Sequence, residues 1–82
     1  SDYDKVNIGI NVCGETLKDL HDITNLVRGT IREYFRENET AIDDYIFDAQ
    51  AIQFDSMKPC YWQVLTYQCD VKIINEDDDE QD

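Results

Sequence analysis

Positively charged residues are few in this sequence, and their shortage excludes several kinds of partner. Seven Lys and Arg face 19 Asp and Glu, which gives the 82 residues a net charge of −12. This balance opposes binding to DNA, RNA or an anionic membrane through an electropositive face. No apolar run approaches the roughly 18 residues of a membrane span, and the first residues lack the basic and apolar regions of a secretory signal. We therefore expect a soluble, intracellular protein that binds neither nucleic acid nor membrane.

Metal-binding and disulfide patterns are lacking too. His21 is the single histidine, and the three cysteines, Cys13, Cys60 and Cys69, show no CxxC spacing. Such an odd, widely spaced set predicts neither a zinc site nor a disulfide framework. We expect three reduced and mostly buried thiols, which indicates a reducing compartment. A reactive or metal-bound thiol is the less favoured alternative.

Catalytic motifs are also absent. The chain contains no GxGxxG, P-loop, GxSxG or HExxH sequence. His21 falls on the polar side of a predicted helix, where a histidine is more often a solvated surface residue than a general base. A chain this short needs nearly every large apolar residue for its core, so few remain to line a pocket for a small molecule. The sequence predicts no enzyme and no cofactor.

The acidic residues are unevenly distributed along the chain. Six of the 19 lie within residues 76–82, and residues 1–75, with seven cations and 13 acids, carry −6. A like-charge run of this kind usually stays solvated and disordered. We expect a single folded domain over residues 1–75 and a disordered acidic tail over residues 76–82.

A strand and a long helix are predicted first. Residues 5–13 alternate strictly between apolar and polar or small side chains, which is typical of a half-buried strand. Gly9 either weakens this strand or marks a place where another backbone comes close. The helix is predicted from Leu17 to about Asn38, with Thr16 and Asp19 as a capping box. Its core-facing stripe consists of Leu17, Leu20, Ile23, Val27, Ile31, Tyr34 and Phe35.

The polar side of the helix is sorted by sign of charge. One flank carries Arg28, Arg32 and Arg36, and the opposite flank carries Asp19, Glu33 and Glu37. Arginines four residues apart repel one another by about 0.2–0.5 kcal/mol per pair, so helix stability alone does not explain them. Two explanations stay open. The arginines meet acids elsewhere in the fold, such as those at positions 43, 44 and 48, or the two flanks make a head-to-tail contact between copies of the chain.

Two further strands complete the predicted fold. Residues 45–54 predict a strand with no cleanly apolar face, and residues 60–74 predict a longer one. A turn around Pro59 joins them into an antiparallel hairpin. The core face of the longer strand carries Tyr61, Leu65, Tyr67, Cys69, Val71 and Ile73. The fold class is therefore α+β, with a small antiparallel or mixed sheet, one long helix packed on one face, and the order strand–helix–strand–strand.

Two stretches of the chain carry a resemblance to a known group. The first is VNIGINVCGETLKDLHDITNLVRGTI, where Gly14 and Thr16 separate an alternating strand from a helix containing Val27 and Arg28. The second is AIQFDSMKPCYWQVLTYQCDVKI, which has the pattern of a closing hairpin. The two together resemble the tail-terminator and tail-completion proteins of long-tailed bacteriophages, which cap a tail tube and join it to the head. Members of that group commonly have a further helix and strand before this first strand.

The resemblance implies a structural role without a cofactor or a reaction. It implies a subunit that assembles as a ring, typically of six, on the end of a tail tube. Its partners would be like subunits and tail-tube or connector proteins, first in the host cytoplasm and then in the virion. The interface candidates are the two charged helix flanks and Trp62, which a subunit with little core gains from burying against a neighbour.

A second hypothesis is a small acidic phage inhibitor that mimics nucleic acid and blocks a restriction or CRISPR nuclease. A fixed array of carboxylates can occupy the basic groove of such a nuclease. The placement of the acids favours the tail-assembly hypothesis, because the densest acids lie in the tail and the helix also carries three arginines.

Overall fold

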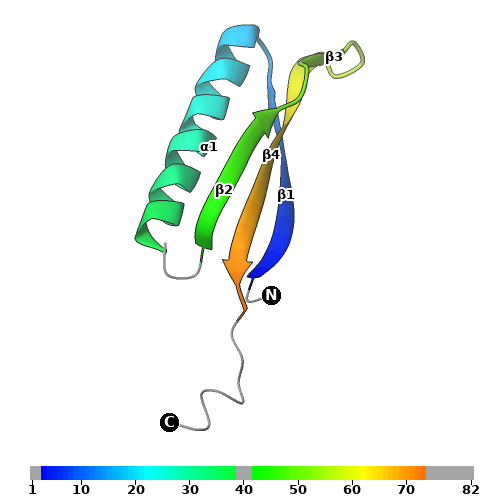
Figure 1. Ribbon diagram of the computed structural model, residues 1–82. Helices are drawn as coiled ribbons and strands as arrows, with labels where there is room; N and C mark the ends of the chain where they lie inside the picture. Colours follow the sequence, from blue (N-terminus) through cyan, green and yellow to red (C-terminus); the bar gives the residue numbers. More distant parts are fainter. Residues whose placement is uncertain (1–2, 39–41, 74–82) are drawn as a thin grey trace, which may run out of the picture.

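One helix lies against one face of an antiparallel sheet (Figure 1). The computed structural model describes residues 3–38 and 42–73, so the predicted acidic tail lies outside the described residues. The predicted α+β class and the order strand, helix, strand, strand are confirmed. The elements are β1 (Tyr3–Gly14), α1 (Leu17–Glu37), β2 (Ile42–Ala49), β3 (Gln53–Asp55) and β4 (Cys60–Lys72).

The central strand of the sheet is β4. Along one side it pairs with the whole of β1, from Tyr3 opposite Lys72 to Gly14 opposite Tyr61. Along its other side it pairs with β2 and, near its own start, with β3. Within the described residues β1 therefore forms one edge of the sheet over its full length.

The predicted strand over residues 45–54 is not continuous, and this prediction was wrong. β2 ends at Ala49 and β3 begins at Gln53, and across the break the pairing with β4 slips by one residue. The Gln50 N–H still donates to the carbonyl of Val64, at 2.9 Å. An extra residue in one strand of a pair exchanges its two faces. This exchange is why the predicted strand had no cleanly apolar face.

Side chains cap both ends of α1, and of the two caps the one at Thr16 was predicted. The Thr16 hydroxyl accepts a hydrogen bond from the backbone N–H of Asp19, at 3.0 Å, and so caps the first turn. At the other end the Asn38 side-chain amide donates to the carbonyl of Tyr34, at 2.8 Å. Gly14 allows the helix to start close to β1, because a Cβ at this position would lie 2.6 Å from the backbone nitrogen of Leu20. The helix is thereby held tightly against the end of β1.

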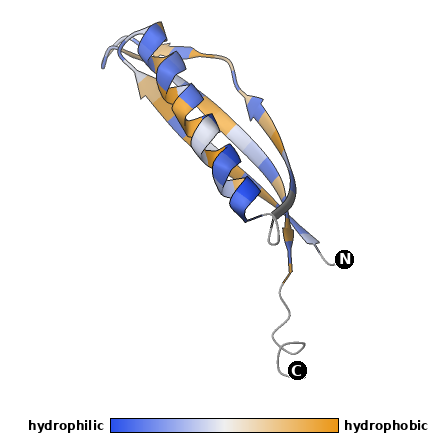
Figure 2. Cartoon of the chain, turned by 90° about the vertical axis from the view of Figure 1, so that its left-hand side faces the viewer, coloured by the Kyte–Doolittle hydropathy of each residue, from blue (hydrophilic) through white to orange (hydrophobic). Residues whose placement is uncertain are grey.

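The core lies between α1 and β4 and forms two clusters. Val12, Leu20 and Leu65 make the first cluster. The second consists of Phe35, Tyr67 and Cys69, and the half-buried Ile10 and Phe47 pack against both. The predicted core face of β4 is confirmed at its three buried positions. Figure 2 shows apolar segments of the sheet beneath the helix.

The predicted apolar stripe of the helix is covered only along its centre. Leu20 and Phe35 are buried, whereas Leu17, Ile23 and Tyr34 are exposed. The sheet beneath the helix is three strands wide, so side chains at the margins of the stripe extend past the covered region. The prediction of a fully core-facing stripe was therefore too broad, as was the placing of Ile73 in the core, because Ile73 is exposed.

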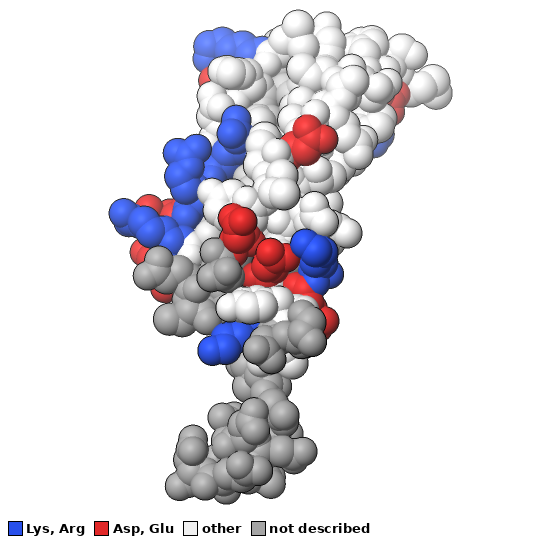
Figure 3. Space-filling view, viewed as in Figure 1, with Lys and Arg blue, Asp and Glu red and all other residues white. Residues whose placement is uncertain are grey.

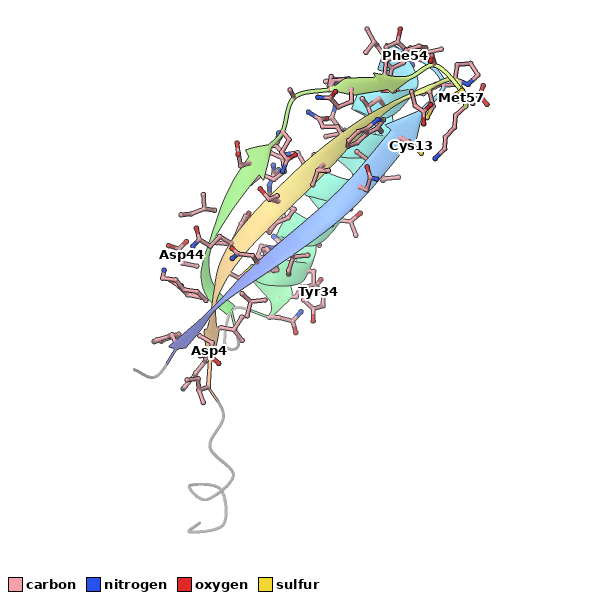
Figure 4. The ribbon with its side chains drawn as sticks, turned by 90° about the vertical axis from the view of Figure 1, so that its right-hand side faces the viewer. Asp4, Cys13, Tyr34, Asp44, Phe54 and Met57 are labelled. Atoms are coloured by element: carbon pink, nitrogen blue, oxygen red, sulfur yellow. The ribbon has the colours of Figure 1, made fainter. Side chains whose placement is uncertain are left out.

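The face of the sheet opposite α1 is bare among the described residues (Figure 4). Asn7, Gly9 and Asn11 lie on this face of β1, next to Gln68, Thr66 and Val64 of β4. No helix within the described ranges is both long and apolar enough to cross a membrane.

Candidate interaction surfaces

The basic flank of α1 lies on the β2 side of the sheet. The guanidinium carbon of Arg28 is 4.1 Å from the centroid of the Phe47 ring, in cation–π geometry. Arg32 follows one turn later and is exposed. Burial raises the pKa of the nearby Tyr67 hydroxyl, and the positive charges of Arg28 and Arg32 partly offset that rise. The flank therefore has one arginine stacked on the sheet and another directed outward.

Only one of the three arginines has an acidic ion-pair partner among the described residues. Arg36 pairs with Glu33 on the same helix, three residues away. Among the described side chains, no ion pair joins Arg28 or Arg32 to an acid, and the side chain of Asp43 lies outside that set. Figure 3 shows the basic side chains along the helix side of the molecule. Arg32 is exposed, and no acid among the described side chains pairs with it.

The acidic flank lies on the β1 side. Asp19 and Glu37 are each nine residues from Arg28, which is two and a half helical turns, so both point away from β2. Since α1 packs over the central strand, the side away from β2 is the side of β1. Each edge of the sheet is thus accompanied by a helix flank of one sign, acidic beside β1 and basic beside β2.

Exposed apolar side chains accompany the acidic flank. Leu26 is 69% exposed and Tyr34 57%, and beneath them Val6 and Ile8 of β1 are 39% and 41% exposed. Figure 4 shows Tyr34 beside the outer edge of β1. We call Val6, Ile8, Ile23, Leu26 and Tyr34 the apolar flank. The sequence pattern did not predict this surface, because most of these residues have the periodicity of core positions. Leu26, an apolar residue on the polar side of the helix, was the one signal of it.

Trp62 lies apart from both helix flanks. It is half-buried on the bare face of the sheet, between Cys13 of β1 and Gln53 of β3. The seven predicted interface residues therefore do not form one site. Arg28 and Arg32 lie toward β2, Asp19 and Glu37 lie toward β1, Glu33 and Arg36 pair with each other, and Trp62 lies on the opposite face of the sheet.

Two of the three thiols, Cys13 and Cys60, line one pocket with Asp55, Lys58 and Trp62. Cys13 is exposed, Cys60 half-buried and Cys69 buried, so the prediction of three mostly buried thiols was wrong for Cys13, which occupies the bare face. Burial raises the pKa of Cys69. The exposed His21 ring lies 3.1 Å from the amide nitrogen of Asn25. No group of three or more His, Cys, Asp or Glu residues in the described ranges is arranged to hold a metal ion.

Two further ion pairs lie on the surface. The Lys18 ammonium is 2.8 Å from the Asp22 carboxylate one turn along α1, and Lys5 of β1 is 3.3 Å from Asp70 of β4. The hydrogen bond and charge of Lys18 lower the pKa of Asp22, and those of Asp22 raise the pKa of Lys18. Exposed ion pairs of this kind contribute little to the free energy of unfolding. These residues therefore mainly determine the distribution of charge on the surface.

Searches against protein families, curated proteins and solved structures find no match to this chain.

Proposed function

We propose that this protein is a structural subunit that works by binding copies of itself and other proteins, as part of a phage tail or head–tail connector. The observation that supports an assembly role best is the pairing of each sheet edge with a charged helix flank, acidic beside β1 and basic beside β2. The exposed apolar flank adds a surface that a partner would cover. The phage setting rests on the resemblance of the two sequence stretches described above.

A ring would use these two edges in a head-to-tail contact. β1 and β2 both run antiparallel to β4, so they point the same way. The β1 edge of one subunit would then lie parallel to the β2 edge of the next. In that arrangement Asp19 and Glu37 of one helix face Arg28 and Arg32 of its neighbour. Such a contact joins two different patches, which is the kind of interface that repeats around a closed ring.

Charge exchange tests this ring. Native mass spectrometry of the chain mixed with a phage tail-tube protein should detect a closed ring. Arg32→Glu should abolish the ring, because it places an acid against the acidic flank. The double variant Arg32→Glu with Glu37→Arg should restore it. Absence of any ring under all these conditions would reject the proposal.

The nuclease-inhibitor alternative has less support. A nucleic-acid mimic needs carboxylates on ordered elements without neighbouring cations. The ordered acids here include Glu33, paired with Arg36, and Asp22, paired with Lys18. Salt-sensitive inhibition of a basic nuclease by the purified chain would revive this alternative, and removal of residues 76–82 would show whether the tail carries it.

A further inference from the structure

The outer edge of β1 is the least protected edge of the sheet. β1 is 12 residues long and pairs with β4 without a register shift, and no described strand lies on its other side. Alternate residues of an edge strand direct their N–H and C=O groups outward, where another strand can pair with them. Proteins usually protect such edges with proline, bulges or charges. Residues 6–13 of β1 contain none of these, whereas β2 has a register shift and carries Asp44 and Asp48.

The sequence of this edge is self-complementary. Residues 6–12, VNIGINV, are the same in both directions and are centred on Gly9. If two copies of β1 pair antiparallel with Gly9 opposite Gly9, Val6 meets Val12, Asn7 meets Asn11 and Ile8 meets Ile10. Apolar side chains then meet apolar ones on the helix side, and amides meet amides on the bare face. Lys5 falls opposite Cys13, so no like charges oppose one another along the paired strands.

Gly9 has no explanation within the single chain. A Cβ at this position would meet nothing within 4 Å, so packing inside the subunit does not require a glycine there. Glycine inside a strand otherwise costs stability and often marks a place where another backbone approaches. In the two-fold pair Gly9 lies on the symmetry axis, opposite Gly9 of the second copy. The backbone that comes close to Gly9 is then that of the second copy.

The same pairing covers the apolar flank. In this register even-numbered residues pair with even-numbered residues, so the side chains on the helix side of one β1 strand lie beside those on the helix side of the other. Both helices therefore lie on the same face of the joined sheet. Leu20 packs at the level of Val12, and Phe35 packs on Tyr67 and Cys69, the pairing partners of Ile8 and Val6. The helix segment from Leu26 to Thr30 therefore lies level with the middle of β1. Leu26 and Tyr34 of each copy would face the same flank of the other across the two β1 strands. Asp19 and Glu37 would also face their own copies, so added salt, which screens their repulsion, should strengthen the dimer.

We propose that the free protein is a two-fold dimer in which β1 pairs antiparallel with β1 of a second copy, Gly9 opposite Gly9, so that two sheets become one. The dimer does not depend on the proposed tail function. It occupies the edge that a head-to-tail ring would use, so a subunit leaves the dimer before it joins a ring. The pair thus keeps free subunits from assembling through this edge.

Disulfide trapping tests the contact and its register. The background variant is Cys13→Ser with Cys60→Ser, which removes the two accessible thiols and leaves the buried Cys69. In this background Gly9→Cys should form a covalent dimer in most chains under mild oxidation, because paired residues lie within the Cα separation of about 4.4–6.8 Å that a disulfide needs. The added side chain has open space in the subunit.

The matched controls use the same strand. Asn7→Cys alone should not cross-link, since two copies of position 7 lie four residues, or about 13 Å, apart along the strands. An equal mixture of Asn7→Cys and Asn11→Cys should give the mixed covalent dimer, and this control holds even if Gly9→Cys misfolds. Cross-linking of Asn7→Cys with itself, or of no variant, overturns the proposal. A larger oligomer in which Gly9→Cys does not cross-link also overturns it and assigns the edge to the head-to-tail contact.

Discussion

Arg28 of α1 lies over the ring of Phe47 in β2, with its guanidinium carbon 4.1 Å from the ring centroid. This contact joins the charged side of the helix to the sheet and determines which edge the basic flank accompanies. It also gives two arginines of one flank different roles. Arg28 belongs to the fold, whereas Arg32, one turn further, has no ion-pair partner among the described residues.

The two arginines should therefore differ in their effect on stability. Arg28→Ala removes a cation–π contact and uncovers Phe47, and it should lower the free energy of unfolding by about 0.5–2 kcal/mol. The control Arg32→Ala should leave it nearly unchanged. Urea denaturation followed by circular dichroism measures both values. An equal loss in the two variants would contradict the assignment of separate roles.

Leu26 should matter for association and not for folding. It is 69% exposed in the single chain, and the two-fold dimer places it over the paired β1 strands. Leu26→Lys should raise the dimer dissociation constant about tenfold or more, equivalent to about 1.4 kcal/mol. Met57→Lys is a matched control, since Met57 is 92% exposed in the turn before β4. Sedimentation equilibrium measures the dissociation constants, and equal values for the two variants would contradict the placing of Leu26 at the contact between the two copies.

The Lys18–Asp22 pair should be visible in an NMR titration. Lys18 lowers the pKa of Asp22 below its usual 3.8, through a hydrogen bond first and its charge second. A lowered pKa in the folded state means that this pair stabilises the protein above the unfolded pKa and loses its effect as the pH falls through the folded value. Lys18→Met should move the Asp22 midpoint up toward 3.8. An unchanged midpoint would show that the pair does not form in solution.

The three thiols should react with iodoacetamide in a fixed order. Cys13 is exposed and should react first, the half-buried Cys60 should follow, and the buried Cys69 should react only after unfolding. Burial raises the pKa of Cys69, so near neutral pH it also has less of the reactive thiolate. Mass spectrometry of peptides from a time course gives the order. Early labelling of Cys69 in folded protein would contradict the packing of the second core cluster.

Patterns that depend on neighbouring residues in the sequence predicted the fold well. The helix was expected from Leu17 to about Asn38 and spans Leu17–Glu37, and Leu65, Tyr67 and Cys69 are buried as the alternation of β4 indicated. The break after Ala49 was not predicted, because a slip in register depends on the strand opposite.

The interaction surfaces could be predicted only in part. Helical periodicity alone predicts that Arg28 lies on the opposite flank of α1 from Asp19 and Glu37. The edge that each flank accompanies depends on how α1 packs across the sheet, and no local pattern contains that information. For the same reason Tyr34 was assigned to the core stripe of the helix and Ile8 to the apolar face of a half-buried strand. Their periodicity is that of buried residues, but the sheet is too narrow for the helix to cover both.

Both the dimer and the ring require that this protein associates with copies of itself, and the molar mass in solution tests that most directly. Sedimentation equilibrium of the unaltered chain over a wide concentration range should show a reversible change from 9.6 kDa to twice that mass. Addition of the tail-tube protein should then convert dimers into a larger ring. A single species of 9.6 kDa at every concentration, with or without the tube protein, would contradict both the dimer and the ring.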